Sequence, residues 1–423
     1  MSNIKSIKNK VFKQIDDQKE ELVKLGSKII STPSENPPGD TTELGEFLKE
    51  YIESKGLNAT IYEPRKGMVN VVSSLKRENT QPHLILNHHM DHFPAGERGA
   101  WNFPPYCGDV VEGKIRGKGA TDMKGGLTSS LFAYTVLGSL DEEIAGNLTI
   151  MLVPDEESAG PWGTRWLLNN VAEVRGSAVL NGEPSGIDNL AIGQKACFFI
   201  RLRTLGAAFH GSTSAWTMKD NAIAKMSNLI PIIQTLASLT GEAPQELKGI
   251  VTAQKEWFRS SDQQGGADSL ERVTINFGKI RGGTSALPNV VPELCELDVD
   301  LRIPIGLTSR DVARVLQSEI AKVDRNVEYE VMQEIDPNWT SPNEKIVKVG
   351  ITNVEEVTGK RPQLEISLWG SELPYFRLRG IPGVCYGPSP VPMGMSNEYV
   401  KIDELVTVAK VHAGIALDYV MGN

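Results

Sequence analysis

The sequence lacks the features that mark several common classes of protein. It contains only four cysteines in 423 residues, and no two of them form a CxxC pair, so neither a disulfide framework nor a zinc–thiolate site is expected. No apolar run approaches the roughly 20 residues that span a bilayer. The charged N-terminal segment also lacks the apolar core of a secretion signal. These absences predict a cytoplasmic protein without a membrane-embedded part.

Excess positive charge and phosphate-binding motifs are absent as well. The formal net charge is -9, so the chain gains no electrostatic help in binding nucleic acid or an anionic membrane, and neither is expected as a partner. The glycine-rich segment 117–126 (GKGATDMKGG) has Asp122 where a dinucleotide fingerprint requires its third glycine, and no GKS/T follows. Phosphate binding is therefore excluded, and a small-molecule substrate of another kind is expected.

The pattern of apolar runs predicts two domains, because a chain of 423 residues is too long for one ordinary core. Up to residue 191, apolar runs such as 148–153 alternate with amphipathic helices, which is typical of a parallel or mixed sheet covered on both faces. Strands with one wet face and two helices then fit an α+β sandwich. We therefore expect an α/β catalytic domain with a mixed, mostly parallel sheet, built from residues 1–191 and 336–423, and an inserted α+β domain at residues 192–335.

Polar residues that could bind a metal stand after one expected strand and before one expected helix. His89 and Asp91 follow an apolar run and point the same way in an extended chain, which suits a metal-binding histidine held by a carboxylate. The alternative is a pair of polar residues that simply leave a strand. Asp122 precedes an expected helix, so it is either a metal ligand or an N-cap.

Acidic residues also follow two further apolar runs. Asp155, Glu156 and Glu157 come directly after one, and Glu183 follows another. Adjacent carboxylates repel each other unless a cation or a shared proton intervenes. One could bind a metal while its neighbour takes a proton from water. Because ligands of open α/β sheets lie outside the carboxyl ends of the strands, the clusters together predict a metal site.

The order of these motifs, His-x-Asp, GxGxxDMKGG, Asp-Glu-Glu and Gly-Glu-Pro, resembles the M20 family of metallopeptidases and deacylases. That group includes acetylornithine deacetylase, succinyl-diaminopimelate desuccinylase, aminoacylase and glutamate carboxypeptidase. The resemblance covers nearly the whole chain, including FHGS at 209–212, NVVP at 289–292 and DLR at 300–302 in the inserted domain. It implies a metal-dependent hydrolase that cleaves a C–N (amide-type) bond in a small carboxylate-bearing substrate. It also implies that the inserted domain serves as a lid and forms a homodimer.

The resemblance assigns the metal ligands as well. His89, a bridging Asp122 and Glu183 would hold a first metal, either zinc or manganese, and Asp91 would orient His89. Glu157 would be a ligand of a second metal.

Catalysis and substrate binding are assigned to further residues. Glu156 would be the general base, which takes a proton from water and gives it to the leaving nitrogen. His210 would reach a partner subunit's site and stabilise the oxyanion. Arg302 and Asn289 would bind the substrate carboxylate, although a salt bridge within the sheet is an equal alternative for Arg302.

The sequence departs from the family pattern near the C-terminus. Gly394 stands where the family has a histidine that completes the second metal site, and none of the six histidines is a good substitute. Glu372 stands where an aspartate is usual. We therefore expect one tight metal site, with the second weak, empty or differently ligated. A mononuclear aminohydrolase that releases an amine or ammonia from a non-peptide substrate, such as an aromatic amine, is the second hypothesis. A non-catalytic binding dimer on the same fold is the third.

Overall fold

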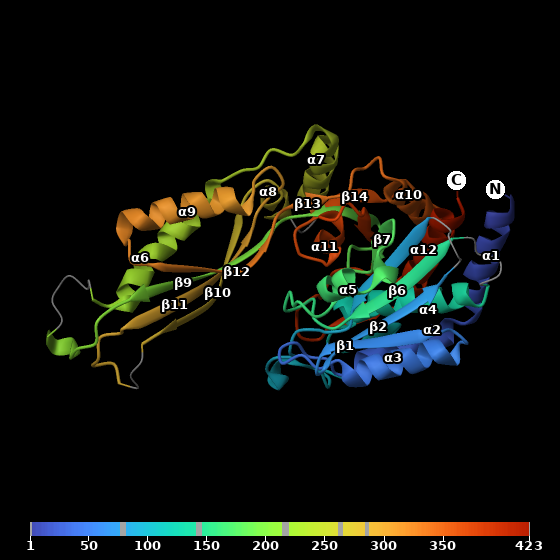
Figure 1. Cartoon of the computed structure of the whole chain (residues 1–423), viewed down its shortest axis with the longest axis horizontal. Coiled ribbons are helices and arrows are strands. Elements are labelled where there is room, and N and C mark those ends of the chain that lie inside the picture. Colours follow the sequence, from blue (N-terminus) through green and yellow to red (C-terminus); the bar gives the residue numbers. More distant parts are fainter. Residues whose placement is uncertain are drawn as a thin grey trace. The chain divides into compact units, whose positions relative to one another are not determined.

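The chain divides into two compact units. The computed structural model describes residues 2–76, 82–140, 146–213, 220–260, 265–283 and 287–422 (Figure 1). The first unit contains Met1–Ile192, Thr340–Glu365 and Ser371–Asn423, and the second contains Gly193–Trp339 and Ile366–Gly370. The predicted boundaries shift slightly, because Ile192 groups with the first unit and residues 336–339 group with the second. The short segment 366–370, predicted in the catalytic domain, also groups with the second unit. The reason is local hydrogen bonding, because Ile366 exchanges two hydrogen bonds with the side chain of Gln254.

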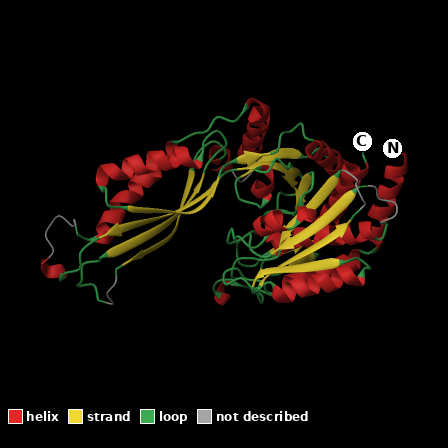
Figure 2. Cartoon of the chain, in the orientation of Figure 1, coloured by secondary structure: helices red, strands yellow, loops and turns green. Residues whose placement is uncertain are grey.

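A large mixed sheet forms the centre of the first unit, with the strand order β1-β2-β6-β3-β7-β15-β8. The strands β6, β3, β7 and β15 are parallel, and β1, β2 and β8 pair antiparallel with their neighbours. This confirms the predicted mixed sheet, which Figure 2 shows with helices on both sides. The sheet is not mostly parallel as predicted, because only its central strands are joined by crossover connections and antiparallel strands lie at both ends. The bounds are β1 Ala59–Arg65, β2 Met68–Leu75, β3 His83–His89, β6 Asn147–Val153, β7 Ala178–Asn181, β8 Asn189–Gln194 and β15 Gly383–Cys385. The short strands β13 Asn338–Trp339 and β14 Gln363–Ser367 pair with β8.

Helices cover the two faces of this sheet. The helices α4 and α12 pack on each other and on β3 at one face. At the other face, side chains of α5 and α11 pack against Ile85, Met151 and Val179. The sequence pattern predicts one helix from about Ile4 to Ile30, but the non-helical backbone of Gln18 (φ -105°, ψ 20°) divides this segment into two helices. The bounds are α1 Ser2–Asp17, α2 Lys19–Ser31, α3 Thr42–Ser54, α4 Gly125–Gly138, α5 Thr164–Asn170, α10 Lys345–Thr358, α11 Leu373–Arg377 and α12 Ile402–Met421.

A small three-stranded sheet joins two distant segments of the first unit. Its order is β16-β5-β4, with bounds β4 Val110–Val111, β5 Lys114–Arg116 and β16 Tyr399–Lys401. Tyr399 pairs with Arg116, so the residue before β16 lies beside the residue after β5. The backbone N–H of Gly117 accordingly donates to the carbonyl oxygen of Glu398 over 2.9 Å. This pairing brings the C-terminal segment to the glycine-rich loop that contains Asp122.

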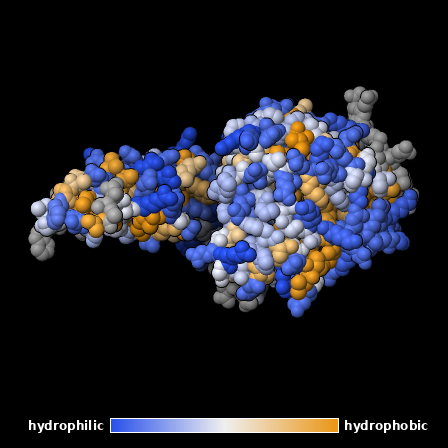
Figure 3. Space-filling model, turned by 90° about the horizontal axis from the view of Figure 1, so that it is seen from below, coloured by the Kyte–Doolittle hydropathy of each residue, from blue (hydrophilic) through white to orange (hydrophobic). Residues whose placement is uncertain are grey.

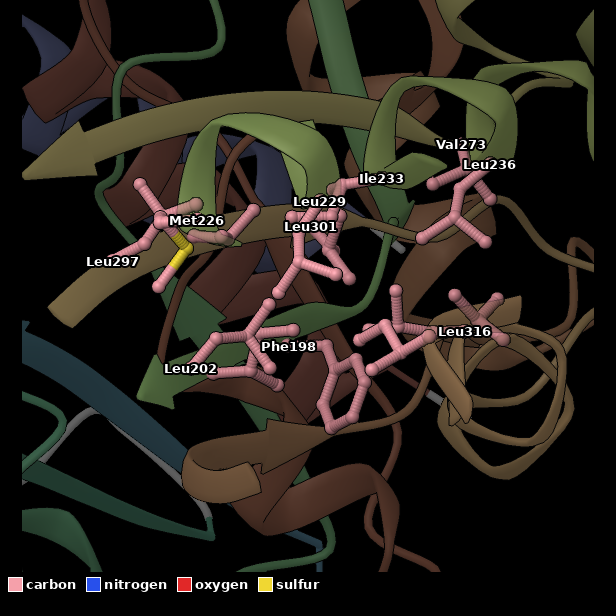
Figure 4. Packing of buried hydrophobic residues seen from close by; sticks show 14 of the residues in the cluster. Phe198, Leu202, Met226, Leu229, Ile233, Leu236, Val273, Leu297, Leu301 and Leu316 are labelled. Carbon is pink, nitrogen blue, oxygen red and sulfur yellow. The ribbon is translucent and has the colours of Figure 1, made fainter. Parts of the chain in front are cut away.

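The second unit is an antiparallel sheet with the order β10-β11-β9-β12, packed against helices. Figure 4 shows side chains of α6, such as Met226 and Leu229, pointing at Leu202 and Leu301 of the sheet. Alternate residues of β11 are buried, as a sheet with one wet face requires. The bounds are β9 Cys197–Leu205, β10 Thr274–Gly282, β11 Leu294–Arg302, β12 Glu328–Ile335, α6 Ala222–Gln234, α7 Gln245–Ser260, α8 Gly265–Ser269 and α9 Ser309–Val323.

The face drawn in Figure 3 is largely hydrophilic, and its hydrophobic patches are small and separate. Among the described helices, none combines the length and the apolar character that crossing a lipid bilayer requires.

Candidate metal centre

The carboxyl ends of parallel strands bring several candidate residues to one edge of the large sheet. β3 ends at His89, which lies opposite Val153, the last residue of β6, and Asp155–Glu157 follow directly. β7 ends at Asn181, which pairs with Asn87 of β3, and Glu183 follows two residues later. Because these strands are parallel and in register, the polar residues that follow them meet at the same edge.

His89, Asp122 and Glu183 form a compact group of possible metal ligands. One donor atom from each lies within 4.8 Å of the others. His89 Nε2 is 3.3 Å from Asp122 Oδ1 and 3.2 Å from Glu183 Oε1. The other ring nitrogen, Nδ1, lies 3.0 Å from the carbonyl oxygen of Asp91 and 3.3 Å from its Oδ1. Because a carbonyl oxygen only accepts hydrogen bonds, Nδ1 carries the proton, and Nε2 is left to face the two carboxylates.

The electrostatics of this group fit a divalent cation. Burial, followed by the charge of Asp122, raises the pKa of Glu183 to about 7. Burial lowers the pKa of His89, but hydrogen bonds to Asp122, Asp91 and Glu183 outweigh it, so the net pKa is raised. The loss of water around Glu156 raises its pKa too. These shifts reflect excess negative charge in a space with little water, which a cation relieves. One imidazole nitrogen and two carboxylate oxygens are ligands suited to zinc or manganese.

Asp91 connects His89 to the turn that follows β6. Its Oδ1 accepts the backbone N–H of Glu156 over 3.2 Å, and its Oδ2 accepts that of Glu157, also over 3.2 Å. Oδ2 also accepts a hydrogen bond of 2.8 Å from Nδ2 of Asn36, a residue that sequence reasoning did not select. Asp91 thus fixes both the imidazole of His89 and the backbone of the two adjacent glutamates.

Asp122 is not the N-cap of the helix that follows it. Its backbone is extended (φ -118°, ψ 104°), and α4 begins at Gly125 with Lys124 in the N-cap position. The Lys124 side chain is buried, and its Nζ donates to the carbonyl oxygen of Thr32 over 2.6 Å. Of the two interpretations open from the sequence, the structure therefore supports a loop that presents Asp122 to the ligand group.

Glu398 holds this loop, and sequence reasoning missed it. Its Oε1 accepts the backbone N–H groups of Thr121 (3.0 Å) and Asp122 (3.1 Å). Its Oε2 accepts the N–H of Gly119 over 3.1 Å and lies 3.2 Å from Nζ of Lys118. Glu398 is completely buried, so these bonds are shielded from water. The sequence offered one signal for this contact: Glu398 ends the C-terminal motif, and Lys118, of opposite charge, lies in the glycine-rich loop.

A chain of buried hydrogen bonds supports Glu183. The backbone N–H of Glu183 donates to Oδ1 of Asn181 over 2.8 Å, and Nδ2 of Asn181 donates to Oδ1 of Asn87 over 3.2 Å. Asn87 in turn donates to Thr164 over 3.0 Å, and Thr164 donates to Glu372. Burial raises the pKa of Glu372 to about 8, so its carboxyl group is mainly protonated at neutral pH. Glu372, which stands where the family usually has aspartate, is therefore the last member of this series of hydrogen bonds.

The second metal position lacks a comparable group. Within the described ranges, His89, Asp122 and Glu183 are the one group of three or more ligand-type residues with suitable spacing. Oε1 of Glu157 accepts the backbone N–H of Phe93 over 3.3 Å. Gly394 lies on an exposed turn at φ 70°, where an added Cβ would meet nothing within 4 Å.

No other described histidine takes the expected ligand's place. Both ring nitrogens of His92 are engaged, Nδ1 with the carbonyl oxygen of Phe93 (2.8 Å) and Nε2 with the N–H of Ser34 (3.2 Å). His412 lies in α12, as expected, and its Nε2 bonds to the carbonyl oxygen of Tyr386. His88, which stands where the family that the sequence resembles usually has glycine, is completely buried in β3.

The remaining three candidates belong to the second unit. His210 is exposed, and its Nδ1 lies 2.7 Å from Oγ of Ser212. The carbonyl oxygen of Asn289, also exposed, accepts the N–H of Gly211 over 2.7 Å, so these two candidates are neighbours. Arg302 pairs with Asp300 over 2.8 Å, as the alternative interpretation from the sequence stated.

Comparison with known proteins agrees with this geometry. The profile of peptidase family M20/M25/M40 matches residues 85–418. The succinyl-diaminopimelate desuccinylase of Bradyrhizobium diazoefficiens is 25% identical, over 94% of this chain and 99% of its own. The N-formyl-4-amino-5-aminomethyl-2-methylpyrimidine deformylase of Halalkalibacterium halodurans is 33% identical over 38% of each chain. An M20 metallo-carboxypeptidase from Sulfolobus solfataricus superimposes with a TM-score of 0.80 at 21% identity, over 94% of this chain and 99% of its own.

Proposed function

This chain belongs to peptidase family M20/M25/M40, and on that premise we propose that Glu156 is the general base with which it hydrolyses a small carboxylate-bearing substrate. It is a metal-dependent hydrolase of C–N bonds, like the desuccinylase and the deformylase to which it is similar. The observation that carries the proposal is the grouping of His89, Asp122 and Glu183 within 4.8 Å, next to the turn that contains Glu156.

The residues divide the chemistry between them. We assign zinc or manganese to His89, Asp122 and Glu183; when bound, such a metal polarises the scissile carbonyl group and lowers the pKa of water. Glu156 accepts the proton of the attacking water and delivers it to the leaving nitrogen. Its raised pKa suits both steps, since a carboxylate with an ordinary pKa is a weak base at neutral pH. Asp91 keeps the imidazole and the turn of Glu156 in place.

The test separates chemistry from metal binding. Glu156→Gln should lower kcat by about 10²- to 10⁴-fold, the usual contribution of a general base, without changing the metal content per chain measured by elemental analysis. Glu157→Gln is the matched control, because it makes the same change on the next residue and should lower kcat far less. A Glu156→Ala protein that binds the same ligands and loses no turnover would instead support the non-catalytic dimer.

A mononuclear aminohydrolase is the second candidate, and the turn at Gly394 favours it. With no histidine on this turn, a single metal faces the developing oxyanion, which suits a substrate with an activated, electron-poor carbon. N-acyl amino acids and dipeptides should be compared with amine-bearing aromatic acids, with the released amine or ammonia as the readout. Turnover confined to the acyl and peptide substrates would remove this candidate.

We further propose that the first unit is the catalytic domain and that the second is a lid that forms a homodimer. The exposed side chains of the edge strand β10 and of His210 support an interface there. If His210 acts in a partner's site, mixing inactive His210→Ala and Glu156→Gln proteins should restore activity, because one site of the mixed dimer is then intact. No restoration would place His210 outside the partner's site. Asn289 and Arg302 should affect KM for the substrate carboxylate when replaced by alanine.

A cytoplasmic location is also proposed. The structure describes all four cysteines as thiols outside any disulfide, and three of them are buried, which fits a reducing compartment. Fractionation of the source cells would test it, and recovery of the protein outside the cytoplasmic fraction would refute it.

A further inference from the structure

Two buried histidines that take no part in the ligand group face each other beneath it. His88 and His412 are completely buried, their ring centroids are 6.0 Å apart, and the ring planes differ by 22°. In β3, Ile85 packs on the α5 and α11 side, so His88, three residues later, faces α4 and α12. Each ring has one nitrogen in a hydrogen bond and one without a partner among the described residues.

The existing hydrogen bonds fix the tautomer of each ring. Nδ1 of His88 accepts the N–H of Gly182 over 3.2 Å, so it carries no proton, and the proton of the ring lies on Nε2. Nε2 of His412 lies 2.7 Å from the carbonyl oxygen of Tyr386, which only accepts, so this nitrogen carries the proton. Burial lowers the pKa of His412 to about 4, and its Nδ1 is therefore a bare acceptor at neutral pH. One ring thus offers a donor, and the other offers an acceptor.

A third buried polar atom also lacks a hydrogen-bond partner among the described residues. Oγ of Ser130, on α4, is buried and has no partner among the described residues. Ser130 follows Gly126 by one helical turn on the same face, and a Cβ at Gly126 would lie 1.9 Å from the carbonyl oxygen of Gly182. Ser130 therefore lies on the side of α4 that faces the segment bonded to His88. Leaving a buried polar group unpaired costs about 1–3 kcal/mol, so such atoms are normally satisfied.

We propose that an internal water molecule binds between His88, His412 and Ser130. It accepts a hydrogen bond from the N–H at His88 Nε2, donates one to His412 Nδ1, and makes its third hydrogen bond with Ser130 Oγ. Buried waters in proteins typically make about three such bonds to groups that otherwise lack partners. A cation is not expected here, because the set contains no carboxylate and one of its two free nitrogens carries a proton.

This water also has a consequence for the ligand group. It keeps the proton of His88 on Nε2, so Nδ1 stays free to accept the N–H of Gly182, the residue before Glu183. His88 is thus a positioning residue for Glu183, in a place where the family usually has glycine. Only this second step rests on the proposed function, since the water site itself does not require a metal.

Spectroscopy of the metal-free protein tests the water site directly. In ¹⁵N-histidine-labelled protein, we expect His88 to be protonated at Nε2 alone and His412 at Nε2 alone. A high-resolution crystal structure should show density about 2.7–3.2 Å from His88 Nε2 and His412 Nδ1. The opposite tautomer at either ring, or the absence of density between them, overturns the proposal. Neither readout depends on activity, so a failure of the water site can be told apart from a failure of the proposed function.

Matched variants test the individual partners. His412→Asn keeps an acceptor near the position of Nδ1, whereas His412→Gln keeps only the bond to Tyr386, so His412→Gln should disturb the His88 signals more. It should also weaken Zn²⁺ binding by about tenfold, as loss of an outer hydrogen bond to a metal site commonly does. Ser130→Ala should shift the His88 Nε2 signal. Ser129→Ala is its control, because Ser129 already bonds to the carbonyl oxygens of Gly125 and Leu405. Equal His88 spectra for the two His412 variants, or equal effects of the two serine variants, would refute the proposed bonding.

Discussion

The two metal positions that the family resemblance implies are supported very differently in this chain. At the first, all three ligands are held by hydrogen bonds, His89 through Asp91, Asp122 through Glu398 and Glu183 through Asn181. At the second, Glu157 is partly exposed, and Gly394 lies on an exposed turn. The same C-terminal segment contains both Gly394 and Glu398, so it serves the first position although it brings no ligand to the second. A metal position therefore depends on the bonds that hold its ligands as well as on the ligands themselves.

Removal of a ligand from the first position should have the largest effect. Asp122→Asn should abolish tight metal binding and activity, because it removes a charge and a donor oxygen beside His89. Glu157→Gln should leave the tightly held metal in place. Elemental analysis after dialysis measures both, and the comparison between the two positions fails if Glu157→Gln loses as much metal as Asp122→Asn.

Removal of the support beneath a ligand should have the next largest effect. In Glu398→Gln, the side-chain NH₂ group replaces one acceptor oxygen and faces a backbone N–H group. That hydrogen bond is lost, so the loop of Asp122 should be misplaced. Loss of such outer bonds typically costs about 10- to 100-fold in metal affinity. Competition with a chelator measures this, and Glu50→Gln, at an exposed position of α3, is a control for general effects of charge removal. An unchanged affinity would mean that Glu398 does not position Asp122.

The pH dependence should also distinguish the first position. The pKa of Glu183 is raised to about 7 from 4.5, so its protonated form contributes stability that is fully present below about pH 4.5 and is lost as the pH rises through about 7. Metal binding requires that proton to leave, and the raised pKa of His89 means that its second proton must leave too, so affinity should fall at least about tenfold for each pH unit below 7. Thermal unfolding from acid to alkaline pH, with and without Zn²⁺, measures both effects. Glu183→Gln should flatten the metal-free curve, and an unchanged curve would contradict the assignment.

Restoring the missing ligand should have the smallest effect on folding. Gly394→His should cost about 1 kcal/mol, because an L-residue is strained at a φ of 70°. We expect the protein to retain a second metal, since the ring completes the set with Glu157. Gly394→Ala carries the same backbone strain without the ring. If the metal content is unchanged, the correspondence between Gly394 and the family histidine is wrong.

The sequence predicted the features that depend on local patterns. The strand predicted at residues 148–153 is observed at Asn147–Val153, because a continuous apolar run between turns has few other solutions. The polar residues after such strands could be grouped because parallel strands end at one edge. The break at Gln18 was missed because no proline or glycine marks it. The helix α7 was missed although Pro244 directly precedes it.

Other parts of the site could not be predicted because they depend on contacts between distant residues. Glu398 reaches Asp122 across 276 residues of sequence, and no periodicity indicates that contact. The partner of Arg302, by contrast, is local: Asp300 and Arg302 lie two residues apart on β11, so the alternation of the strand puts both on its wet face. The roles assigned to His210, Asn289 and Arg302 stay predictions.

The arrival of Glu398 near the end of the chain has a consequence for how the enzyme matures. A ribosome releases the N-terminal part first, and domains of a nascent chain generally fold in that order. The segment with His89, Asp122 and Glu183 therefore emerges long before the carboxylate that fixes the glycine-rich loop and before β15, which pairs with β7. A nascent chain should hold metal only weakly until almost all of it has been translated. Loading with metal is thus coupled to completion of synthesis, so truncated products should not compete for the cell's metal.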